Sequence, residues 1–246
     1  MSKRAVVLAG GKGKRLRPYT VVLPKPLMPI GEYPILEVIV RQLVFFGFDH
    51  ITLAVNHQAD IIRAFFQDGE KWGARIDYSL ETAPLSTIAP LKLLADLPAD
   101  FLLMNGDVLT DLNLKDFFSK HISEQRLFTI SAARRKHVID YGVLDTDHAG
   151  RLSGFREKPA HEYLVSMGIY GVSRGILDLV PDSLKYGFDD LMSTMLAAKL
   201  PVYVEQYSGE WLDIGRPDDY VNAIDTFEQK KELLLRQPRH TPAVTL

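Results

Sequence analysis

The segment after the first apolar run of the chain concentrates glycine and positive charge. Three glycines fall within four residues, at Gly10, Gly11 and Gly13, so the backbone there can turn tightly and point several N–H groups toward one anion. Cationic side chains surround them: Lys12, Lys14, Arg15, Arg17 and Lys25. This combination predicts a loop that binds the phosphates of a polyphosphate ligand.

Two familiar phosphate-binding loops do not fit the spacing of this segment. A dinucleotide fingerprint that uses Gly11 and Gly13 needs a third glycine at position 16, which is Leu. A Walker-type loop that ends in Gly13-Lys14 needs Ser or Thr next, but Arg15 follows. A solvated surface turn stays open as the plain alternative, although glycines, cations and the end of an apolar run coincide here.

Two aspartates follow later apolar segments. Asp107 comes after the apolar run 101–104 and Gly106, and Asp213 lies just before the last long helical segment. An acid at the carboxyl end of a strand can hold a hard cation that bridges phosphate oxygens. A single aspartate can equally cap a turn or a helix, so the residues by themselves leave both interpretations open.

The run from Gly10 to Thr20, continued by Pro24-Lys25-Pro26, resembles the signature of the sugar-1-phosphate nucleotidylyltransferases, also called NDP-sugar pyrophosphorylases. The family pattern is roughly G-G-x-G-T-R-L-x-P-x-T and then P-K-P; the chain departs from it at Lys14, where Thr is usual. The resemblance extends over about residues 4 to 230. It implies an enzyme that condenses an NTP with a sugar 1-phosphate, releases pyrophosphate and uses Mg²⁺.

The resemblance also implies roles for individual residues. Arg15 and Lys25 are the expected catalytic residues, Arg15 for the leaving pyrophosphate and Lys25 for the α-phosphate or the sugar phosphate. Asp107 and Asp213 are expected to bind Mg²⁺ together. The expected nucleotide-binding residues are Leu8, Ala9, Gly10, Gly11, Gly13, Lys14, Glu81, Ser86 and Thr87. The expected sugar-phosphate-binding residues are Gly142, Glu157, Lys158, Ser166 and Gly168.

The size of the chain and its Glu81…Pro84-Leu85 segment are most similar to the mannose- or heptose-1-phosphate guanylyltransferases, which implies GTP. The alternative is dTTP or UTP with glucose 1-phosphate. Ser86 replaces a usual glycine of the base loop, and Ser166 replaces a usual asparagine of the sugar site. The nucleobase and the sugar therefore both stay open.

Two functions of other classes are the competing hypotheses. A metal-dependent glycosyltransferase would show acids in a D-x-D arrangement, and Asp145-Thr146-Asp147 has that spacing, but the segment is typical of a solvated hairpin. A non-catalytic nucleotide-sugar binder would not need both the aspartate pair and both cations. Release of pyrophosphate from an NTP and a sugar 1-phosphate would separate the nucleotidylyltransferase from the glycosyltransferase, and tight binding without turnover would indicate the binder.

The elements that must position these residues alternate along the chain. We expect strands at 4–9, 50–55, 75–80, 100–104, 127–132, 163–171 and 201–206, and helices at 35–46, 59–66, 87–97, 114–121, 174–179, 188–198 and 217–235. This order predicts an α/β fold, a doubly wound, Rossmann-like three-layer sandwich with a mostly parallel, mixed central sheet. We expect one catalytic domain over 1–235 and a poorly ordered tail over 236–246.

Composition narrows the remaining possibilities. The 246 residues contain no cysteine, which excludes disulfides, thiolate nucleophiles and Cys-ligated metals. The net charge is −2, although the first 31 residues carry +7, and this balance predicts no nucleic-acid partner. Without a signal-like segment or a long apolar stretch, we expect a cytoplasmic protein with no membrane partner. The expected partners are an NTP and a sugar 1-phosphate, and we allow for a homo-oligomer.

Overall fold

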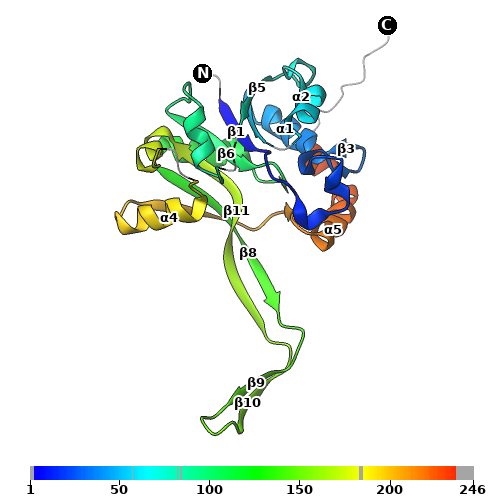
Figure 1. Ribbon diagram of the computed structural model, residues 1–246, viewed down its shortest axis with the longest axis vertical. Coiled ribbons are helices and arrows are strands. Elements are labelled where there is room, and N and C mark those ends of the chain that lie inside the picture. The colour runs from blue at the N-terminus through cyan, green and yellow to red at the C-terminus, as the bar shows by residue number, and fades with distance from the viewer. Residues whose placement is uncertain (1–2, 57, 82, 84, 183–184, 237–246) are drawn as a thin grey trace.

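The computed structural model describes residues 3–56, 58–81, 83, 85–182 and 185–236. Its centre is a seven-stranded sheet of order β12-β8-β11-β6-β1-β4-β5 (Figure 1). The strands are β1 (Arg4–Leu8), β4 (His50–Val55), β5 (Arg75–Leu80), β6 (Asp100–Asn105), β8 (Phe128–Val138), β11 (Ala160–Ser173) and β12 (Val202–Tyr207). Of these strands, β11 alone runs antiparallel to both neighbours. The predicted mostly parallel, mixed sheet is therefore confirmed.

Three short pairs of strands accompany the sheet. They are β2 (Pro29–Ile30) with β3 (Tyr33–Pro34), β7 (Val108–Thr110) with β13 (Trp211–Asp213), and β9 (Val143–Thr146) with β10 (Leu152–Arg156). The helices are α1 (Ile35–Phe45), α2 (Ala59–Phe66), α3 (Leu114–Ser123), α4 (Phe188–Ala197), α5 (Pro217–Gln229) and α6 (Lys231–Leu235). Among the described residues, no helix has the length and apolar composition needed to cross a membrane.

The sheet is buried on both faces because successive side chains of a strand point to opposite sides. In β1, Val7 packs into a core with residues of α1, α2, α3 and α5, whereas Val6 packs into a second core with residues of α4. In β6, Leu102 packs into the first core and Leu103 packs into the second. Helices therefore cover both faces of the sheet, which gives the three layers that the alternation of strands and helices predicts.

Three predicted helices differ from the structure. The helix expected over 87–97 is only a 3-10 segment, Ala89–Leu93, and the backbone N–H groups of Ile88 and Ala89 donate to the carbonyl of Tyr186. Residues 174–179 likewise form 3-10 helix. The helix expected over 217–235 divides into α5 and α6 at Lys230, whose backbone leaves the helical region.

The tail expected over 236–246 has one described residue, and residues 237–246 lie outside the described part of the chain. Arg236 itself is held, since its guanidinium donates to the carbonyl of Asp111 at 2.8 Å.

The strands β8 and β11 are both longer than the sequence pattern predicted. The first six residues of β8, 128–133, are buried, and the last five, 134–138, are exposed. These last five residues pair with the outer half of β11, and β9 and β10 form a hairpin beyond them. Figure 1 shows this two-stranded extension leaving the body of the molecule. We call residues 134–165 the arm.

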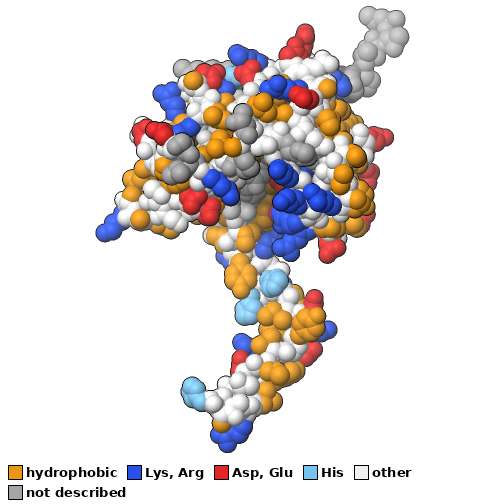
Figure 2. Space-filling model, viewed as in Figure 1, with side chains coloured by type: hydrophobic (Ala, Val, Ile, Leu, Met, Phe, Trp, Pro, Cys, Tyr) orange, Lys and Arg blue, Asp and Glu red, His pale blue; other side chains and the backbone are white. Residues whose placement is uncertain are grey.

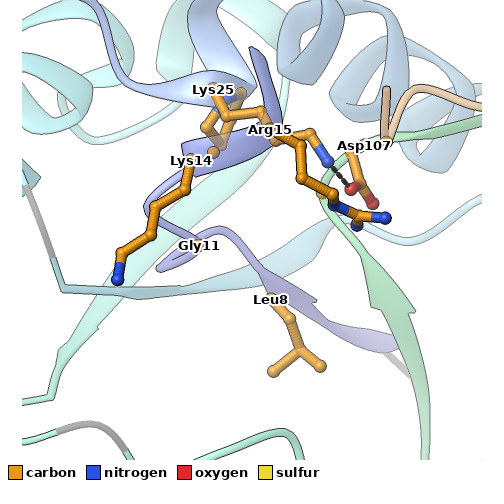
Figure 3. Close-up of a pocket in the computed structure, with 10 residues that line it drawn as sticks. Leu8, Gly11, Lys14, Arg15, Lys25 and Asp107 are labelled. Atoms are coloured by element: carbon orange, nitrogen blue, oxygen red, sulfur yellow. Dashed lines mark hydrogen bonds and ion pairs between the residues drawn. The ribbon is translucent and has the colours of Figure 1, made fainter. Parts of the chain in front are cut away.

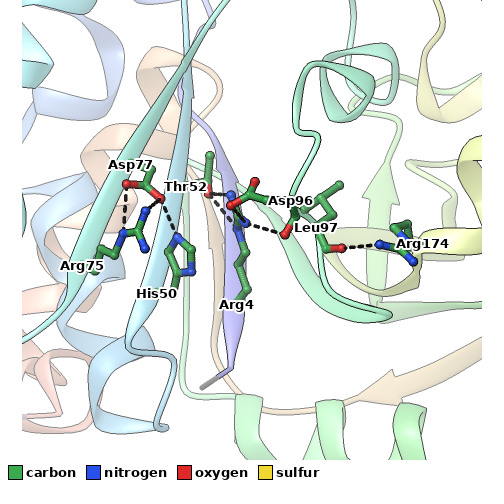
Figure 4. Close-up of polar contacts among 8 residues, drawn as sticks. All are labelled: Arg4, His50, Thr52, Arg75, Asp77, Asp96, Leu97 and Arg174. Atoms are coloured by element: carbon green, nitrogen blue, oxygen red, sulfur yellow. Dashed lines mark hydrogen bonds and ion pairs between the residues drawn. The ribbon is translucent and has the colours of Figure 1, made fainter. Parts of the chain in front are cut away.

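Arg4 is a buried arginine of β1 that connects its own strand to β4 and to the segment before β6 (Figure 4). The Arg4 guanidinium donates twice to the hydroxyl of Thr52 in β4, at 3.0 and 2.8 Å, and once to the carbonyl of Asp96 at 3.0 Å. Its charge is paired with the Asp96 carboxylate at 2.8 Å. A buried cation needs these partners because an unpaired one would carry a large desolvation cost.

We expect Thr52→Val to lower the free energy of unfolding by about 1–3 kcal/mol, because the isosteric side chain leaves two Arg4 donors without their acceptor. Urea unfolding would measure this. Thr146→Val in β9, where the side chain is exposed, is the control and should change stability by less than about 0.5 kcal/mol. Equal effects at the two positions would contradict the role given to Arg4.

Candidate active site

A pocket of about 270 Å³ opens at the carboxyl ends of β1 and β6 (Figure 3). It is lined by Leu8, Gly11, Gly13, Lys14, Arg15, Lys25, Pro26, Gly106, Asp107 and Gly215. Residues from four separated stretches of sequence thus surround one space. We call it the phosphate pocket.

The glycine loop needs Gly13 for its shape. Gly13 has φ +55°, and a Cβ there would lie 2.7 Å from Cγ2 of Thr20. The Thr20 hydroxyl and the N–H of Leu16 both donate to the Gly13 carbonyl, at 2.8 and 2.9 Å. The buried Leu16 anchors this turn, so that Lys14 and Arg15 extend from it, Arg15 toward Asp107 and Lys14 away from it (Figure 3).

Backbone contacts between the segment around Asp107 and the segment around Asp213 bring these two residues together. The N–H of Ile214 donates to the Asp107 carbonyl at 3.0 Å, and Asp213 pairs with Val108 where β13 joins β7. Burial raises the pKa of Asp213 above its ordinary value, and the nearby Asp107 carboxylate raises it further. The two carboxylates therefore interact directly through their charges.

Arg15 and Lys25, the two expected catalytic residues, both line the phosphate pocket. The ammonium of Lys25, a buried residue with 8% exposure, forms an ion pair with the Asp107 carboxylate. A Cβ placed on Gly215 would lie 3.4 Å from the Arg15 guanidinium and 3.4 Å from Oδ1 of Asp213. Arg15 and Asp213 thus border the same glycine. Arg15, Lys25 and Asp107 line the pocket, and Asp213 lies behind the lining residue Gly215 without lining the pocket itself.

The donor set suits a hard divalent cation such as Mg²⁺. Asp107 and Asp213 offer carboxylate oxygens, which Mg²⁺ prefers, and it commonly takes only one or two carboxylates from a protein, with water and phosphate oxygens as further ligands. Their mutual repulsion, visible in the raised pKa of Asp213, is the kind that a bound cation relieves. Within the described part of the chain, no cluster of three or more acidic or histidine side chains could hold a metal.

A second pocket, of about 530 Å³, continues from the first and shares Leu8, Gly11, Lys14 and Asp107 with it. It is lined further by Gly10, Lys12, Asn56, Glu81, Ser86, Thr87 and Asn105. We call it the base pocket because Glu81, Ser86 and Thr87 belong to the loop expected to contact a nucleobase. The sequence analysis did not predict Asn56 or Asn105 as site residues. Asn56 directly follows β4, and Asn105 is the last residue of β6. The signal that could have identified them is this position, because ligands of this fold class bind at the carboxyl ends of the strands.

Glu81 is an acidic residue of the base pocket, in addition to the shared Asp107. The N–H of Leu85 donates to its carboxylate at 3.4 Å, and Asn56 is a second hydrogen-bond partner. Burial nevertheless raises the pKa of the Glu81 carboxyl. A half-buried carboxylate beside an open pocket has capacity to accept further hydrogen bonds from a ligand.

The segment after Glu81 contains a strained residue. Ser86 has φ +74°, a conformation that glycine adopts freely, and glycine is what the family pattern has here. Thr87 is held in place because its hydroxyl accepts the N–H of Phe188 at 2.8 Å. Ala9 behaves differently from its neighbours: it is buried, its N–H donates to the carbonyl of Ala54, and it lines neither pocket.

The five predicted sugar-side residues fall into two groups. Gly168 has φ +76° and borders the base-pocket residue Asn105, since a Cβ there would lie 2.6 Å from Nδ2 of Asn105. Ser166 lies next to it, and its hydroxyl accepts the Gly168 N–H and contacts the Tyr170 hydroxyl. Gly142, Glu157 and Lys158 lie instead where the β8–β11 ribbon meets the β9–β10 hairpin, and they line neither pocket. The structure does not bring this second group to Asp107.

The family model described as Nucleotidyl transferase matches residues 4–230. A UTP–glucose-1-phosphate uridylyltransferase of Synechocystis is 34% identical over 241 residues, which cover 90% of this chain and 62% of that protein. A mannose-1-phosphate guanyltransferase of Yarrowia lipolytica is 32% identical over 228 residues, covering 89% and 62%. The chain thus spans less than two thirds of the length of these relatives.

Solved structures agree with the sequence comparisons. The crystal structure of HddC from Yersinia pseudotuberculosis has a TM-score of 0.72 at 26% identity, and the match covers 92% of this chain and 99% of that one. A structure of HddC complexed with GMP-PN has a TM-score of 0.70 at 25% identity and covers the same shares. The resemblance carried by the glycine loop is confirmed over nearly the whole described chain, which belongs to the nucleotidyl transferase family.

Proposed function

We propose that the protein is a sugar-1-phosphate nucleotidylyltransferase, which condenses an NTP with a sugar 1-phosphate to give an NDP-sugar and pyrophosphate. The observation that carries the proposal is the phosphate pocket, where Arg15, Lys25 and Asp107 surround the glycine loop at the carboxyl ends of two parallel strands. Relatives at about 30% identity are named for transfers of this class. A cysteine-free chain also suits a reducing compartment such as the cytoplasm.

The reaction requires one bond to form and one to break. An oxygen of the sugar 1-phosphate attacks the α-phosphorus of the NTP, and the bond from that phosphorus to the oxygen shared with the β-phosphate breaks, so pyrophosphate leaves. The attacking oxygen is already an anion at neutral pH, because the second pKa of a phosphate monoester is about 6. No general base is needed, and catalysis consists of positioning and charge stabilisation.

The residues of the phosphate pocket supply that stabilisation. Backbone N–H groups around Gly11 and Gly13 bind the triphosphate, as in other turns that present successive N–H groups to an anion. Arg15 extends into the pocket and stabilises the charge that develops on the leaving pyrophosphate. Lys25, oriented by its ion pair with Asp107, reduces the repulsion between the two phosphate-bearing substrates.

Mg²⁺ is the proposed cofactor, and Asp107 and Asp213 are the residues that would hold it. When bound, it supplies neutralisation of phosphate charge and fixes the orientation of the phosphates. The chain's own contribution is to hold the two carboxylates side by side through the Ile214 to Asp107 hydrogen bond.

GTP with a mannose- or heptose-type 1-phosphate is the preferred substrate pair, and UTP or dTTP with glucose 1-phosphate is the alternative. The base pocket contains the half-buried Glu81 carboxylate. Guanine has an N1–H and an exocyclic amine on one edge, so it offers a carboxylate two donors, whereas uracil and thymine offer one. HddC, crystallised with GMP-PN, is consistent with a guanine nucleotide.

The glycosyltransferase hypothesis has less support. The carboxylates of Asp145 and Asp147 both form contacts within the β9–β10 hairpin. Asp145 accepts a hydrogen bond from the Arg156 guanidinium, and Asp147 accepts hydrogen bonds from the N–H groups of Ala149 and Arg151. Such contacts are typical of the solvated hairpin that the sequence predicted, and they lie on the arm rather than at a pocket.

Arg15→Ala should lower kcat/KM by about 10²–10³-fold while the fold is kept, because it removes one charged contact to the transition state. Pyrophosphate release from GTP and mannose 1-phosphate would measure this. Arg17→Ala is the matched control, since Arg17 is exposed, two residues further on, and outside the pocket lining. Near-wild-type turnover in Arg15→Ala would refute the proposed role.

Asp213→Asn should have opposite effects on activity and stability. Turnover should fall by about 10²–10³-fold, while the metal-free variant should melt at a higher temperature than the wild type, because it no longer buries a carboxylate beside Asp107. Mg²⁺ should raise the melting temperature of the wild type and not of the variant. Asp218→Asn, at an exposed position nearby in α5, should show neither the loss of turnover nor the gain in melting temperature.

Glu81→Gln should reduce the ratio of kcat/KM for GTP over UTP by about 10-fold or more, because a hydrogen bond to a charged group contributes about 1.5–3 kcal/mol. The KM for the sugar 1-phosphate serves as the internal control and should not change. An unchanged GTP to UTP ratio would favour the uridylyl or thymidylyl alternative.

A further inference from the structure

Asp213 belongs to a pair of strands that is separate from the seven-stranded sheet. Among the described strands, β13 pairs with β7 alone, Trp211 opposite Thr110 and Asp213 opposite Val108. β7 begins directly after Asp107. The relative position of the two aspartates therefore depends on how this small pair of strands is held against the main sheet.

A bulge in β11 lies at the level where these strands approach the sheet. The register between β11 and β8 shifts between Ser166 and Tyr170, and residues 167–169 of β11 lie opposite Ser131 alone. The Ser131 hydroxyl donates to the carbonyl of Ile169 at 2.9 Å, which fixes the bulge from the side of β8. We call residues 167–169 the β11 bulge. Bulges are frequent next to active sites, where they redirect side chains or end a ladder.

The β11 bulge contacts the segments of both aspartates. The indole N–H of Trp211 donates to the carbonyl of Met167 at 3.0 Å, and Trp211 precedes Asp213 by two residues. At the next residue of the bulge, Gly168 has φ +76°, and a Cβ on it would lie 2.6 Å from Nδ2 of Asn105, two residues before the other aspartate. One short segment of β11 therefore touches the residues that lead into both carboxylates.

Trp211 is held on its ring face as well as at its N–H. The guanidinium of Arg135 lies 4.5 Å from the centre of the Trp211 ring, a favourable cation–π contact. Arg135 belongs to the exposed part of β8, and Figure 2 shows Lys and Arg side chains gathered on the body beside the root of the arm. From α1, Gln42 donates to the Thr110 carbonyl of the paired strand at 2.9 Å. The β7–β13 pair is thus held from the sheet by Trp211 and from the helical layer by Gln42.

The geometry of β13 transmits the position of the indole to the carboxylate. Residues two apart in a strand lie on the same face, about 7 Å from each other. Trp211 and Asp213 have this relation. Because Met167 is fully buried, its carbonyl would lose its indole donor without access to water if the N–H were removed, and the strand would shift to relieve that cost.

We propose that Trp211 is a positioning residue for Mg²⁺ binding, because its indole N–H, bonded to the Met167 carbonyl in the β11 bulge, sets the place of the Asp213 carboxylate beside Asp107. The inference rests on the proposed function for the Mg²⁺ site and deepens it. Trp211 lines neither pocket and acts through Asp213.

The chain contains a matched control for this tryptophan. Trp72, the second of the two tryptophans, packs on Phe65 and Phe66 of α2. Its indole N–H is buried and has no hydrogen-bond partner among the described residues. Trp72→Phe therefore removes the same atoms as Trp211→Phe without breaking a hydrogen bond.

Trp211→Phe should raise the dissociation constant for Mg²⁺ by about 10-fold or more, as the loss of contacts that orient metal ligands commonly does. Trp72→Phe should leave this constant unchanged. The rise of the melting temperature with the concentration of Mg²⁺ alone, without nucleotide, measures it. The Mg²⁺ concentration for half-maximal turnover should rise by the same factor, while kcat returns toward the wild-type value at saturating Mg²⁺. A lower melting temperature without Mg²⁺, combined with an unchanged dissociation constant, would overturn the proposal.

Ser131→Ala tests the same bulge without altering β13, and it keeps the proposal falsifiable if Trp211→Phe does not fold. The variant removes one oxygen atom and the bond to Ile169, so Mg²⁺ binding should weaken in the same direction. Ser193→Ala is its control, since the Ser193 hydroxyl also donates to a backbone carbonyl, that of Asp189 at 2.9 Å, within α4. Equal Mg²⁺ binding in the two serine variants would contradict the role of the bulge.

Tryptophan fluorescence provides a readout that is independent of catalysis. Trp72→Phe leaves Trp211 as the single tryptophan, so the emission reports on β13. Addition of Mg²⁺ should change this emission, and the further substitution Asp213→Asn should abolish the change. No response to Mg²⁺ in either melting temperature or emission would overturn the proposal. Weakened Mg²⁺ binding in Trp211→Phe, in a protein with no turnover on any NTP, would support the positioning role and refute the proposed function alone.

Discussion

The geometry of the site depends on one close approach of two strands. The N–H of Gly106 donates to the carbonyl of Leu8 at 2.9 Å, and a Cβ on Gly106 would lie 2.9 Å from that oxygen. Because this residue has no side chain, the end of β6 lies directly against the end of β1. Asp107 therefore lies beside the glycine loop. Any larger residue at 106 would separate the acid from the cations, and the phosphate pocket would lose its arrangement.

The distribution of charge around the phosphate pocket depends on this close approach of the two strands. The cations Arg15 and Lys25 come from the first 31 residues, which carry +7, and the carboxylates Asp107 and Asp213 come from the rest of the chain, which carries −9. Folding places the two groups around one pocket, where Lys25 pairs with Asp107 and Asp213 is left half-buried next to a like charge. That arrangement costs stability, and the proposed Mg²⁺ would relieve the repulsion between the two carboxylates, a frequent compromise between stability and function.

The arm shows a different relation between sequence and structure. Its residues alternate and pair as strands, which the pattern over 127–132 and 163–171 predicted in part, but the strands continue past the core into solvent. The last five residues of β8, 134–138, are exposed, so this part of the strand lies outside the two buried cores.

The sequence by itself determined the α/β fold, most strand and helix positions, and the identity of the glycine loop, because these depend on local periodicity and on a long motif. It did not predict that residues 87–97 form only a short 3-10 segment. The N–H groups of Ile88 and Ala89 donate hydrogen bonds to the carbonyl of Tyr186, which is almost 100 residues away in the sequence. Only the tertiary structure joined Asn56, Asn105 and Glu81 in the base pocket and placed Glu157 and Lys158 on the arm. Distances between residues remote in sequence depend on how strands pair and end, and a local pattern contains no information about them.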